Sequence, residues 1–440
     1  QTRTTENAER FPRIWFKPGH IGEFMGMLLS QKINSVKPGR KPSEYMVYPA
    51  PREGKYPHPF ADFGTKAVQN GIRVLMLAGV RTADNILDEV EASGRGGGPA
   101  TIVLLDYALP LADRRMLAKS IKLRYKADEV VVVLDRVMAL FLAGFPEIER
   151  IGAFLAAALP SSYVKPYKSD GRGPIPPEMF IGRAKELAEM QNMNGPVFVY
   201  GGRQLGKTAL LKETCNREHD PENGRYAVYC DLCEMTAEGA LRKIGDELGR
   251  ANVLDAVPES WEALTAALRE KLENGQRPIR KLMLLLDEAD EFLADCERNG
   301  NRPLVLLKEL RDAVPGMFKF VLAGLRNVVR FNRRLLSGNS VLAQLGHLTI
   351  RPLNYLDARD LLLRPLQYVG FRLKENSEEL ISLILAKTNY YPGLIHFYCQ
   401  KLIEAIADSY RKGVYSESTA PPYILGEGHI KTLLGQKDFL

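Results

Sequence analysis

Apolar and polar positions alternate in blocks along the first part of the chain. Continuous apolar runs over Ile72 to Ala78, Thr101 to Asp106 and Glu129 to Asp135 predict three strands. Between them, Asp84 to Ala92 and Leu111 to Tyr125 carry apolar residues at helical spacing. Strands that are apolar throughout and joined by helices are typical of a parallel sheet covered on both faces. This region is therefore predicted to be a Rossmann-like α/β domain.

The segments that flank this domain have different patterns. Frequent prolines in residues 1–60 predict mostly irregular structure there, apart from one helix over Ile21 to Ile33. After the third strand, the apolar runs Val137 to Phe145 and Ile151 to Leu159 come nearest to membrane segments. Both are far shorter than the ~20 residues that span a bilayer, so we expect buried helices and no membrane partner.

A second set of strand and helix patterns follows Tyr163 to Pro177, a stretch rich in proline, glycine and charge. Its apolar runs, Pro196 to Tyr200, Leu282 to Leu286 and Phe318 to Ala323, predict strands of a second parallel sheet. From about Pro352 the strand signals stop and helical patterns continue. The predicted organisation is an N-terminal α/β domain (1–162), a linker (163–177), an α/β core (178–351), and a helical lid with a C-terminal tail (352–440).

Composition limits the class of protein without naming a function. A chain of 440 residues is too long for one ordinary core, and 45% hydrophobic with 26% charged residues is typical of soluble globular proteins. The first residues lack the apolar region of a secretory signal, and the five cysteines have no framework spacing. Both observations favour a cytoplasmic protein. The net charge of +7 is compatible with nucleic acid as a partner.

The densest basic stretch consists of Arg326, Arg330, Arg333 and Arg334. We interpret it as a helix surface that faces solvent or phosphate, and a DNA-binding surface is the alternative.

One group of residues has spacing that resembles a zinc site, namely Cys215, His219, Cys230 and Cys233. Cys230, however, lies inside the apolar run Tyr226 to Leu232, which predicts a buried strand. Successive strand residues point to opposite faces, so Cys230 and Cys233 would diverge. The strand interpretation is therefore preferred to a zinc site.

The strongest chemical signal is a glycine-rich loop between a predicted strand and a predicted helix. The loop matches the phosphate-binding pattern G-x-x-x-x-G-K-[ST] in its required context. It consists of Gly201, Gly202, Arg203, Gln204, Leu205, Gly206, Lys207 and Thr208, and Ala209 follows in the helix. Its backbone N–H groups and the helix N-terminus would surround the phosphates. Lys207 would reach the β- and γ-phosphates, and the Thr208 hydroxyl would bind Mg²⁺.

An acidic pair, Asp287 and Glu288, follows the apolar run Leu282 to Leu286. At the carboxyl edge of a parallel sheet this pair is expected beside the phosphate loop. Asp287 would hold Mg²⁺ through water, and Glu288 would polarise the attacking water. Asp290 and Glu291 are expected to cap the next helix, with Asp290 as an alternative contributor to the metal site.

The run Phe318 to Ala323 also ends near a charged residue, Arg326. In such sheets a polar residue at this strand end can sense the γ-phosphate, and Arg326 is the candidate for this role. In the alternative interpretation, Arg326 only solvates the start of a helix.

From about Glu178 to Gln400 the chain resembles the AAA-like and STAND class of P-loop NTPases, which have an additional catalytic strand. The phosphate loop, the Asp287–Glu288 strand and the upstream segment Phe180, Ile181, Gly182 and Arg183 carry this resemblance. It implies that the upstream segment packs around the adenine. Residues 388–392 resemble the lid motif G-x-P, but Tyr390 stands where Gly is usual, so only Pro392 carries over. Members of the class usually continue into a winged helix, which is not complete before Leu440.

The resemblance implies ATP or ADP with Mg²⁺ as cofactors and slow, regulatory ATP hydrolysis. The expected function is a nucleotide-dependent switch in signal transduction, for example in bacterial antiviral defence, with self-association or a protein partner as its output. One alternative is a DNA-remodelling ATPase similar to origin-recognition or transposition-helper ATPases. A scaffold that binds nucleotide without turnover is the other alternative, and Glu288 argues against it. The resemblance does not reach residues 1–160.

Overall fold

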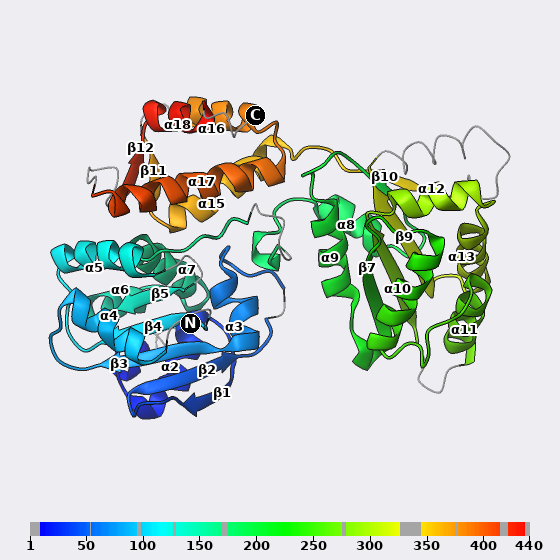
Figure 1. The fold of residues 1–440 in the computed structure, drawn as a ribbon. Helices are drawn as coiled ribbons and strands as arrows, with labels where there is room; N and C mark the ends of the chain where they lie inside the picture. The colour runs from blue at the N-terminus through cyan, green and yellow to red at the C-terminus, as the bar shows by residue number, and fades with distance from the viewer. Residues whose placement is uncertain are drawn as a thin grey trace. The chain divides into compact units, whose positions relative to one another are not determined.

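The computed structural model describes residues 9–52, 54–94, 98–125, 129–168, 175–274, 279–325, 345–374, 377–413 and 421–435. Its contacts divide the chain into two compact units. Unit 1 comprises Gln1–Ile181, Asn354–Tyr390 and Leu394–Leu440, and unit 2 comprises Gly182–Leu353 and Tyr391–Gly393. Figure 1 draws most of unit 2 in green.

Unit 1 is built on a five-stranded sheet with the order β1-β2-β3-β4-β5. The last three strands, β3 (Ile72–Leu77), β4 (Thr101–Leu105) and β5 (Val131–Leu134), are parallel. Helices α4 (Ala83–Ala92) and α5 (Leu111–Arg124) connect them. The predicted Rossmann-like alternation of strands and helices is thus confirmed for this part of the chain.

The prediction that residues 1–60 are mostly irregular is wrong. Two antiparallel strands, β1 (Ile33–Pro38) and β2 (Glu44–Pro49), extend the sheet beside β3. Their prolines, Pro38 and Pro49, stand at the last strand positions, where a missing N–H interrupts little pairing. Helix α2 (Ile21–Leu29) ends at Ser30, whose φ of 55° stops it before Ile33.

The two apolar runs after β5 are helices, but only one of them is buried as predicted. Helix α7 (Glu147–Ala158) buries its inward face, including Ile151 and Phe154. Helix α6 (Arg136–Ala143) leaves Val137, Leu140 and Phe141 more than half exposed, at 57%, 58% and 53%. Its apolar run is longer than the face that the sheet can cover.

The C-terminal part of unit 1 is helical, as predicted, with two short strands that were not. Its helices are α15 (Tyr355–Tyr368), α16 (Ser377–Lys387), α17 (Pro392–Arg411, which starts in unit 2) and α18 (Glu427–Leu434). The N-terminal region of unit 1 also contains the short helix α3 (Thr65–Asn70). The parallel strands β11 (Phe371–Leu373) and β12 (Tyr423–Leu425) pair with each other.

The beginning of the predicted linker is packed inside unit 1. Tyr167 is buried, and its hydroxyl donates to the backbone oxygens of Leu361 and Leu362 in α15 at 3.2 and 2.8 Å. Lys165 forms an ion pair with Glu404 in α17 at 2.9 Å. The structure therefore groups most of residues 352–440 with the N-terminal domain in one compact unit, whereas the sequence suggested separate segments.

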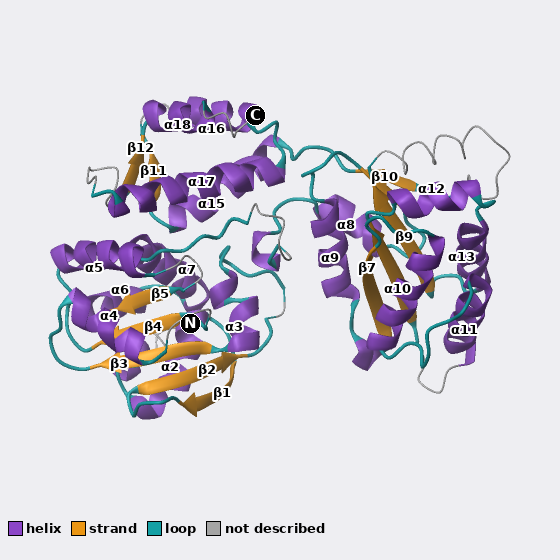
Figure 2. Ribbon diagram, viewed as in Figure 1, coloured by secondary structure: helices purple, strands orange, loops and turns teal. Residues whose placement is uncertain are grey.

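Unit 2 contains a parallel five-stranded sheet with the order β10-β6-β9-β8-β7. Its elements are β6 (Phe198–Tyr200), β7 (Arg225–Asp231), β8 (Lys281–Asp287), β9 (Phe318–Gly324), β10 (His347–Thr349) and helices α8 (Ala184–Gln191), α9 (Lys207–Glu218), α10 (Ala237–Arg250), α11 (Trp261–Asn274), α12 (Asp290–Arg298) and α13 (Arg302–Ala313). Strand β9 lies between β6 and β8, which is the additional strand of the predicted fold class. Figure 2 shows helices on both faces of this sheet.

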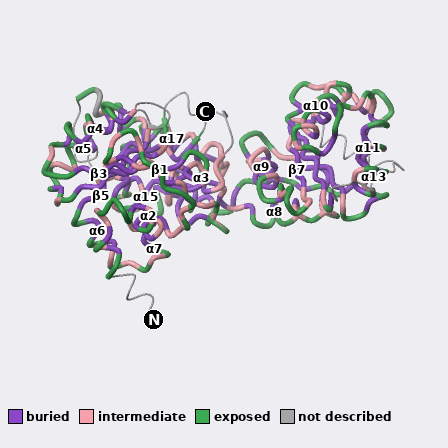
Figure 3. The backbone as a smooth tube through the Cα atoms, turned by 90° about the horizontal axis from the view of Figure 1, so that it is seen from below, coloured by how far each residue is buried: buried purple, intermediate pink, exposed green. Residues whose placement is uncertain are grey.

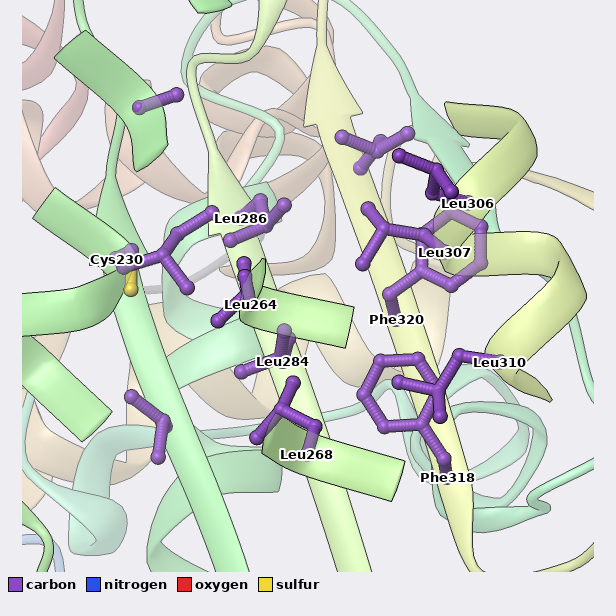
Figure 4. Packing of buried hydrophobic residues seen from close by; sticks show 14 of the residues in the cluster. Cys230, Leu264, Leu268, Leu284, Leu286, Leu306, Leu307, Leu310, Phe318 and Phe320 are labelled. Atoms are coloured by element: carbon purple, nitrogen blue, oxygen red, sulfur yellow. The ribbon is translucent and has the colours of Figure 1, made fainter. Parts of the chain in front are cut away.

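The core of unit 2 holds its central strands in place. Leu284 and Leu286 of β8 are fully buried with Leu264 and Leu268 of α11 on one face of the sheet (Figure 4). Leu285 is equally buried on the opposite face, so β8 is covered on both sides. Each fully buried leucine contributes about 1.5–3 kcal/mol of transfer free energy. Such a core fixes the carboxyl ends of the strands. Figure 3 shows the buried positions of the chain in purple and the exposed ones in green.

Among the helices of the described ranges, not one is both long and apolar enough to cross a membrane.

Candidate functional site

The glycine-rich loop connects β6 to α9 and needs its glycines for different reasons. A Cβ at Gly201 would lie only 2.7 Å from the backbone oxygen of Ile350, which packs against the loop. Gly206 has a φ of 90°, a left-handed conformation that L side chains rarely adopt. Helix α9 then begins at Lys207, so its first N–H groups and the positive end of its dipole face the loop.

Lys207 is a buried cation that bonds to the loop itself. Its Nζ donates to the backbone oxygens of Gly201 and Gly202 at 3.0 and 3.1 Å, and the residue is 6% exposed. Burial lowers the pKa of Lys207, while the charges of Glu288 and Asp287 act in the opposite direction. A desolvated ammonium held by neutral carbonyls would be stabilised by an anion placed on the loop.

The acidic pair lies at the end of β8. Asp287 is 1% exposed; its Oδ2 accepts a hydrogen bond from the Tyr229 hydroxyl and its Oδ1 accepts one from the Glu288 N–H, both at 3.0 Å. Glu288 has a φ of 50°, which turns the chain sharply after the strand. Burial raises the pKa of Glu288, and the neighbouring charge of Asp287 adds to this, while Lys207 opposes it. Because the charges of Glu288 and Asp287 both act on the pKa of Lys207, the three groups lie close to one another.

The start of the loop, Gly201 to Arg203, and Glu288 of the acidic pair border one cleft of about 1140 Å³. Its lining consists of Tyr200, Gly201, Gly202, Arg203, Cys233, Glu234, Glu288, Asp290, Glu291 and Leu325. Asp290 and Glu291 are the first residues of α12, but its N-cap is Ala289 without a side-chain hydrogen bond, so the prediction that they cap the helix is wrong. Asp290 Oδ2 accepts a hydrogen bond from the Leu325 N–H at 2.7 Å. This bond ties the end of β9 to the acidic segment.

Sequence reasoning missed Tyr229, Cys233 and Glu234 as site residues. All three come from β7 or the turn after it. Asp231 and Asp287 are register partners in the pairing of β7 with β8, so the residues that follow both strands reach the same edge. The signal that could have found them is strand order, which the sequence alone does not provide.

The upstream segment, Phe180 to Arg183, is divided between the two units. Arg183 is 8% exposed, and its guanidinium donates to the backbone oxygens of Leu205, at 3.1 Å, and Arg351 and pairs with Glu186 at 2.9 Å. It therefore ties the phosphate loop to the chain after β10. Gly182 and Arg183 belong to unit 2, whereas Phe180 and Ile181 are grouped with unit 1. The adenine-binding role expected of this segment stays a prediction.

Residues Tyr391–Gly393 also lie against the loop, within unit 2. The Gly393 N–H donates to the Gln204 oxygen at 3.1 Å, and a Cβ at Gly206 would lie 3.7 Å from Pro392 Cγ. Pro392 is at the same time the first residue of α17, as in the alternative that it simply starts a helix. Tyr390, which stands where the G-x-P motif has Gly, adopts a φ of 57°, and this left-handed backbone explains why Gly is usual there.

The remaining predicted residues are placed as follows. Thr208 and Ala209 lie in the first turn of α9. Arg326 lies outside the described residues, as do Arg330, Arg333 and Arg334.

The strand interpretation of Cys230 is confirmed. Cys230 is buried in β7, where burial raises its pKa to about 12, whereas Cys233 is exposed. Cys215 Sγ and His219 Nδ1 both lie near the Ala227 backbone oxygen, at 3.3 and 3.0 Å. Across the described ranges of the chain, no three His, Cys, Asp or Glu side chains are grouped as a metal site would require.

Comparison with known proteins supports the fold of unit 2. Residues 191–330, which include the phosphate loop and the acidic pair, match the family model of an AAA domain. No curated protein matches the sequence. The match and the strand order agree on an AAA-type P-loop fold for unit 2.

Solved structures with some similarity belong to ATPases and replication proteins. The Walker-type ATPase PABY2304 of Pyrococcus abyssi is 16% identical, with 56% of this chain and 74% of that chain covered and a TM-score of 0.44. The ORC2 protein of Aeropyrum pernix, in its ADPNP–ADP complexes, is 17% identical, with 60% and 70% covered and a TM-score of 0.42. Domain III of the replication initiation protein DnaA of Thermotoga maritima is 18% identical, with 60% and 95% covered and a TM-score of 0.35. At these identities and TM-scores, no function transfers to this chain.

Proposed function

We propose that the chain is a regulatory ATPase, a switch that binds ATP with Mg²⁺ at the phosphate loop and hydrolyses it slowly. One observation carries the proposal. Gly201, Gly202 and Arg203 of the glycine-rich loop border a single cleft, large enough for a nucleotide, together with the acidic residues that follow β8, Glu288, Asp290 and Glu291. The buried ammonium of Lys207 is bonded to two of these loop residues, Gly201 and Gly202. A cation beside backbone N–H groups suits phosphates, and carboxylates beside them suit a divalent metal.

In this proposal each residue has a separate role. The loop N–H groups and the N-terminus of α9 bind the phosphates, and Lys207 exchanges its two carbonyl partners for phosphate oxygens. Thr208 and Asp287 would hold the metal. Mg²⁺, when bound, supplies positive charge that offsets the charge of the phosphates.

Glu288 is the proposed general base. It borders the cleft, and the raised pKa of its carboxyl group makes it a better proton acceptor for a water molecule. Its left-handed backbone turns it out of the strand direction that Asp287 follows. The two carboxylates thus have different environments, which suits a metal-holding role for the buried one and a proton-accepting role for the other.

The proposed switch is the segment Tyr391–Gly393. Because Gly393 bonds to the Gln204 oxygen, a rearrangement of the loop around phosphates would change the start of α17. A Cβ at Gly393 would lie 2.7 Å from Gln204 Cβ, so this approach requires glycine. Such a contact offers the differential interaction that a ligand-driven switch needs. Defence or signalling by nucleotide-dependent self-association is the output we propose for this class of switch.

The test is gel filtration and calorimetry of the full chain with ADP and then with a slowly hydrolysed ATP analogue, beside the Lys207→Ala variant. The proposal predicts micromolar binding by the wild-type chain only, and a change in elution volume with the ATP analogue. Absence of nucleotide binding would refute the ATPase, and binding without a change in assembly would refute the self-association output.

A DNA-remodelling ATPase is the other candidate, and the net charge of +7 is its support. A mobility-shift titration at several salt concentrations separates the two. DNA binding that weakens steeply with salt and strengthens with ATP would favour remodelling over the switch.

A further inference from the structure

Tyr229 and Lys212 form a chain of contacts that ends on the buried carboxylate of Asp287. The Tyr229 hydroxyl donates to Asp287 Oδ2 at 3.0 Å. On its other side, Lys212 Nζ lies 4.9 Å from the centre of the Tyr229 ring, within the range of a cation–π contact. Lys212 belongs to α9, the helix that starts at Lys207. These contacts connect the helix of the phosphate loop with the acidic end of β8.

The carboxylate of Asp287 has little rotational freedom as a result. Its two oxygens accept from two different donors, the Tyr229 hydroxyl and the Glu288 N–H. The Tyr229 hydroxyl is the donor of this bond, because an ionised carboxylate only accepts. A carboxylate fixed in this way keeps its remaining lone pairs in a constant direction.

We propose that Tyr229, supported by Lys212, is a positioning residue that orients Asp287 toward a divalent cation in the cleft. The proposal rests on the proposed function, since it assigns a role at the same nucleotide site. Tyr229 contacts the proposed metal-holding carboxylate and acts through it. The chemistry that it serves is a divalent cation bound together with nucleotide phosphates.

The alternative is that Tyr229 only satisfies a buried carboxylate. A buried Asp needs hydrogen-bond donors whether or not it holds a metal. Loss of the donor would then lower the stability of unit 2 without a specific effect on metal-dependent binding. The two explanations differ in whether the effect depends on the cation.

The experiment compares ADP affinity in excess Mg²⁺ with ADP affinity in EDTA, by calorimetry on the full chain. For Tyr229→Phe we expect the gain in affinity due to Mg²⁺ to fall roughly ten-fold, the scale seen when a partner of a metal ligand is removed. Affinity in EDTA should stay at the wild-type value. Equal affinities to wild type in both conditions, or equal losses in both, would overturn the proposal.

Tyr226→Phe is the matched control. Tyr226 lies on the same strand and in the hydrophobic core cluster, three positions earlier, so its side chain points to the other face of the sheet. Removal of its hydroxyl should leave the Mg²⁺ gain unchanged. An equal fall of the gain in this control would count against a specific role of Tyr229.

Two further variants keep the proposal testable if Tyr229→Phe folds poorly. Lys212→Met should lower the gain in ADP affinity due to Mg²⁺ by roughly three-fold. It removes only the weaker cation–π contact with the Tyr229 ring, and Lys212 does not bond to the carboxylate itself. In an Asp287→Asn background, Tyr229→Phe should cause no additional loss, because the two residues act as a unit. Additive losses would overturn the inference, whereas a wild-type chain that binds no ADP would instead refute the proposed function.

Discussion

Both units contain parallel strands that end in an aspartate, but the structure uses these carboxylates differently. In unit 1, β4 is followed by Asp106 and β5 by Asp135; in unit 2, β8 ends at Asp287. Sequence patterns make the three positions look alike. What surrounds each carboxylate separates them.

In unit 1 the carboxylates accept hydrogen bonds from backbone N–H groups. Asp135 is fully buried and accepts hydrogen bonds from the N–H groups of Leu109 and Met138, at 2.7 and 2.8 Å, and an ion pair from Arg114 at 2.7 Å. Asp106 accepts from the Gly79 N–H at 2.9 Å. Their oxygens hold loops and the start of α6.

In unit 2 the acidic end of β8 lies beside a cation instead. The charges of Glu288 and Asp287 act on the pKa of Lys207 against the effect of its burial, and Lys207 opposes the rise in the pKa of Glu288. The loop after β3 in unit 1, residues 78–82, has no glycine-rich GK pattern. A carboxylate at a strand end therefore indicates a ligand site only when a phosphate-binding loop reaches the same edge of the sheet.

The largest expected effect comes from Lys207→Ala, which removes the cation that distinguishes unit 2. Loss of two charge-assisted hydrogen bonds, each of about 1.5–3 kcal/mol, should weaken ATP binding by roughly a thousand-fold in calorimetry. Because Lys207 also bonds to Gly201 and Gly202, fluorescence of Trp261 should be recorded to check that unit 2 stays folded. The exposed Lys185 of α8 provides the control Lys185→Ala, with unchanged binding. Retained micromolar affinity in Lys207→Ala would contradict the assignment of the loop.

The next prediction compares the acidic strand ends directly. Glu288→Gln should keep ATP binding and lower hydrolysis by ~10² or more, the scale of a lost general base. Asp106→Asn, the matched change at a strand end of unit 1, should leave turnover at the wild-type rate, since its carboxylate bonds to Gly79. Phosphate release is the measurement. Unchanged turnover in Glu288→Gln, or an equal loss in Asp106→Asn, would remove the distinction between the two units.

Local patterns predicted the strands and the loop because they depend on neighbours in sequence. The strands β6, β8 and β9, the glycine-rich loop and the acidic pair all have such patterns. Strand β10 (His347–Thr349) is as short as β6 but, unlike β6, lies in no apolar run, and β1 and β2 were obscured by their prolines.

Contacts that depend on strand order or packing were beyond prediction. Nothing in the sequence near Tyr229 indicates that its hydroxyl reaches Asp287, because β7 and β8 are far apart along the chain. Arg183 was expected at the base, but its hydrogen bonds to Leu205 and Arg351 depend on how the loop and the chain after β10 pack. The sequence therefore predicted the phosphate loop and the acidic pair, but not the contacts that hold them in position.

Acid should affect the two units unequally, because unit 1 contains two buried histidines. Burial lowers the pKa of His58 to about 3 and that of His396 to about 4. In each ring Nδ1 accepts a backbone N–H, from Phe60 and from Lys168, so a proton there would break a bond. The histidines of unit 2, His219 and His347, are exposed.

The direction in which stability changes with pH follows from proton binding by the unfolded chain. Below the ordinary pKa of 6.5 the unfolded chain binds protons that folded unit 1 excludes, so stability is full above this pH and falls toward pH 4. At pH 5.5 each buried histidine should cost about 1.4 kcal/mol. Urea unfolding at pH 7.5 and 5.5 measures this, with Trp15 reporting unit 1 in a Trp261→Phe variant and Trp261 reporting unit 2 in a Trp15→Phe variant. An equal acid loss in both units would contradict the prediction.

The smallest predicted effect concerns Pro392, which starts α17 beside the phosphate loop. Its Cγ would lie 3.7 Å from a Cβ at Gly206, so the ring borders the loop, yet it also occupies the first position of a helix, where proline is favoured for its fixed φ. If the ring contacts bound nucleotide, Pro392→Ala should weaken ADP binding by about 1–2 kcal/mol, the value of one buried apolar contact. Pro303, in the first turn of α13, is the matched control, because Pro303→Ala removes the same ring from a helix start elsewhere in unit 2. The control should change the melting temperature alone. If Pro392→Ala also changes only the melting temperature, Pro392 starts a helix and nothing more, and the lid that the sequence predicted loses the residue on which its contact with nucleotide depends.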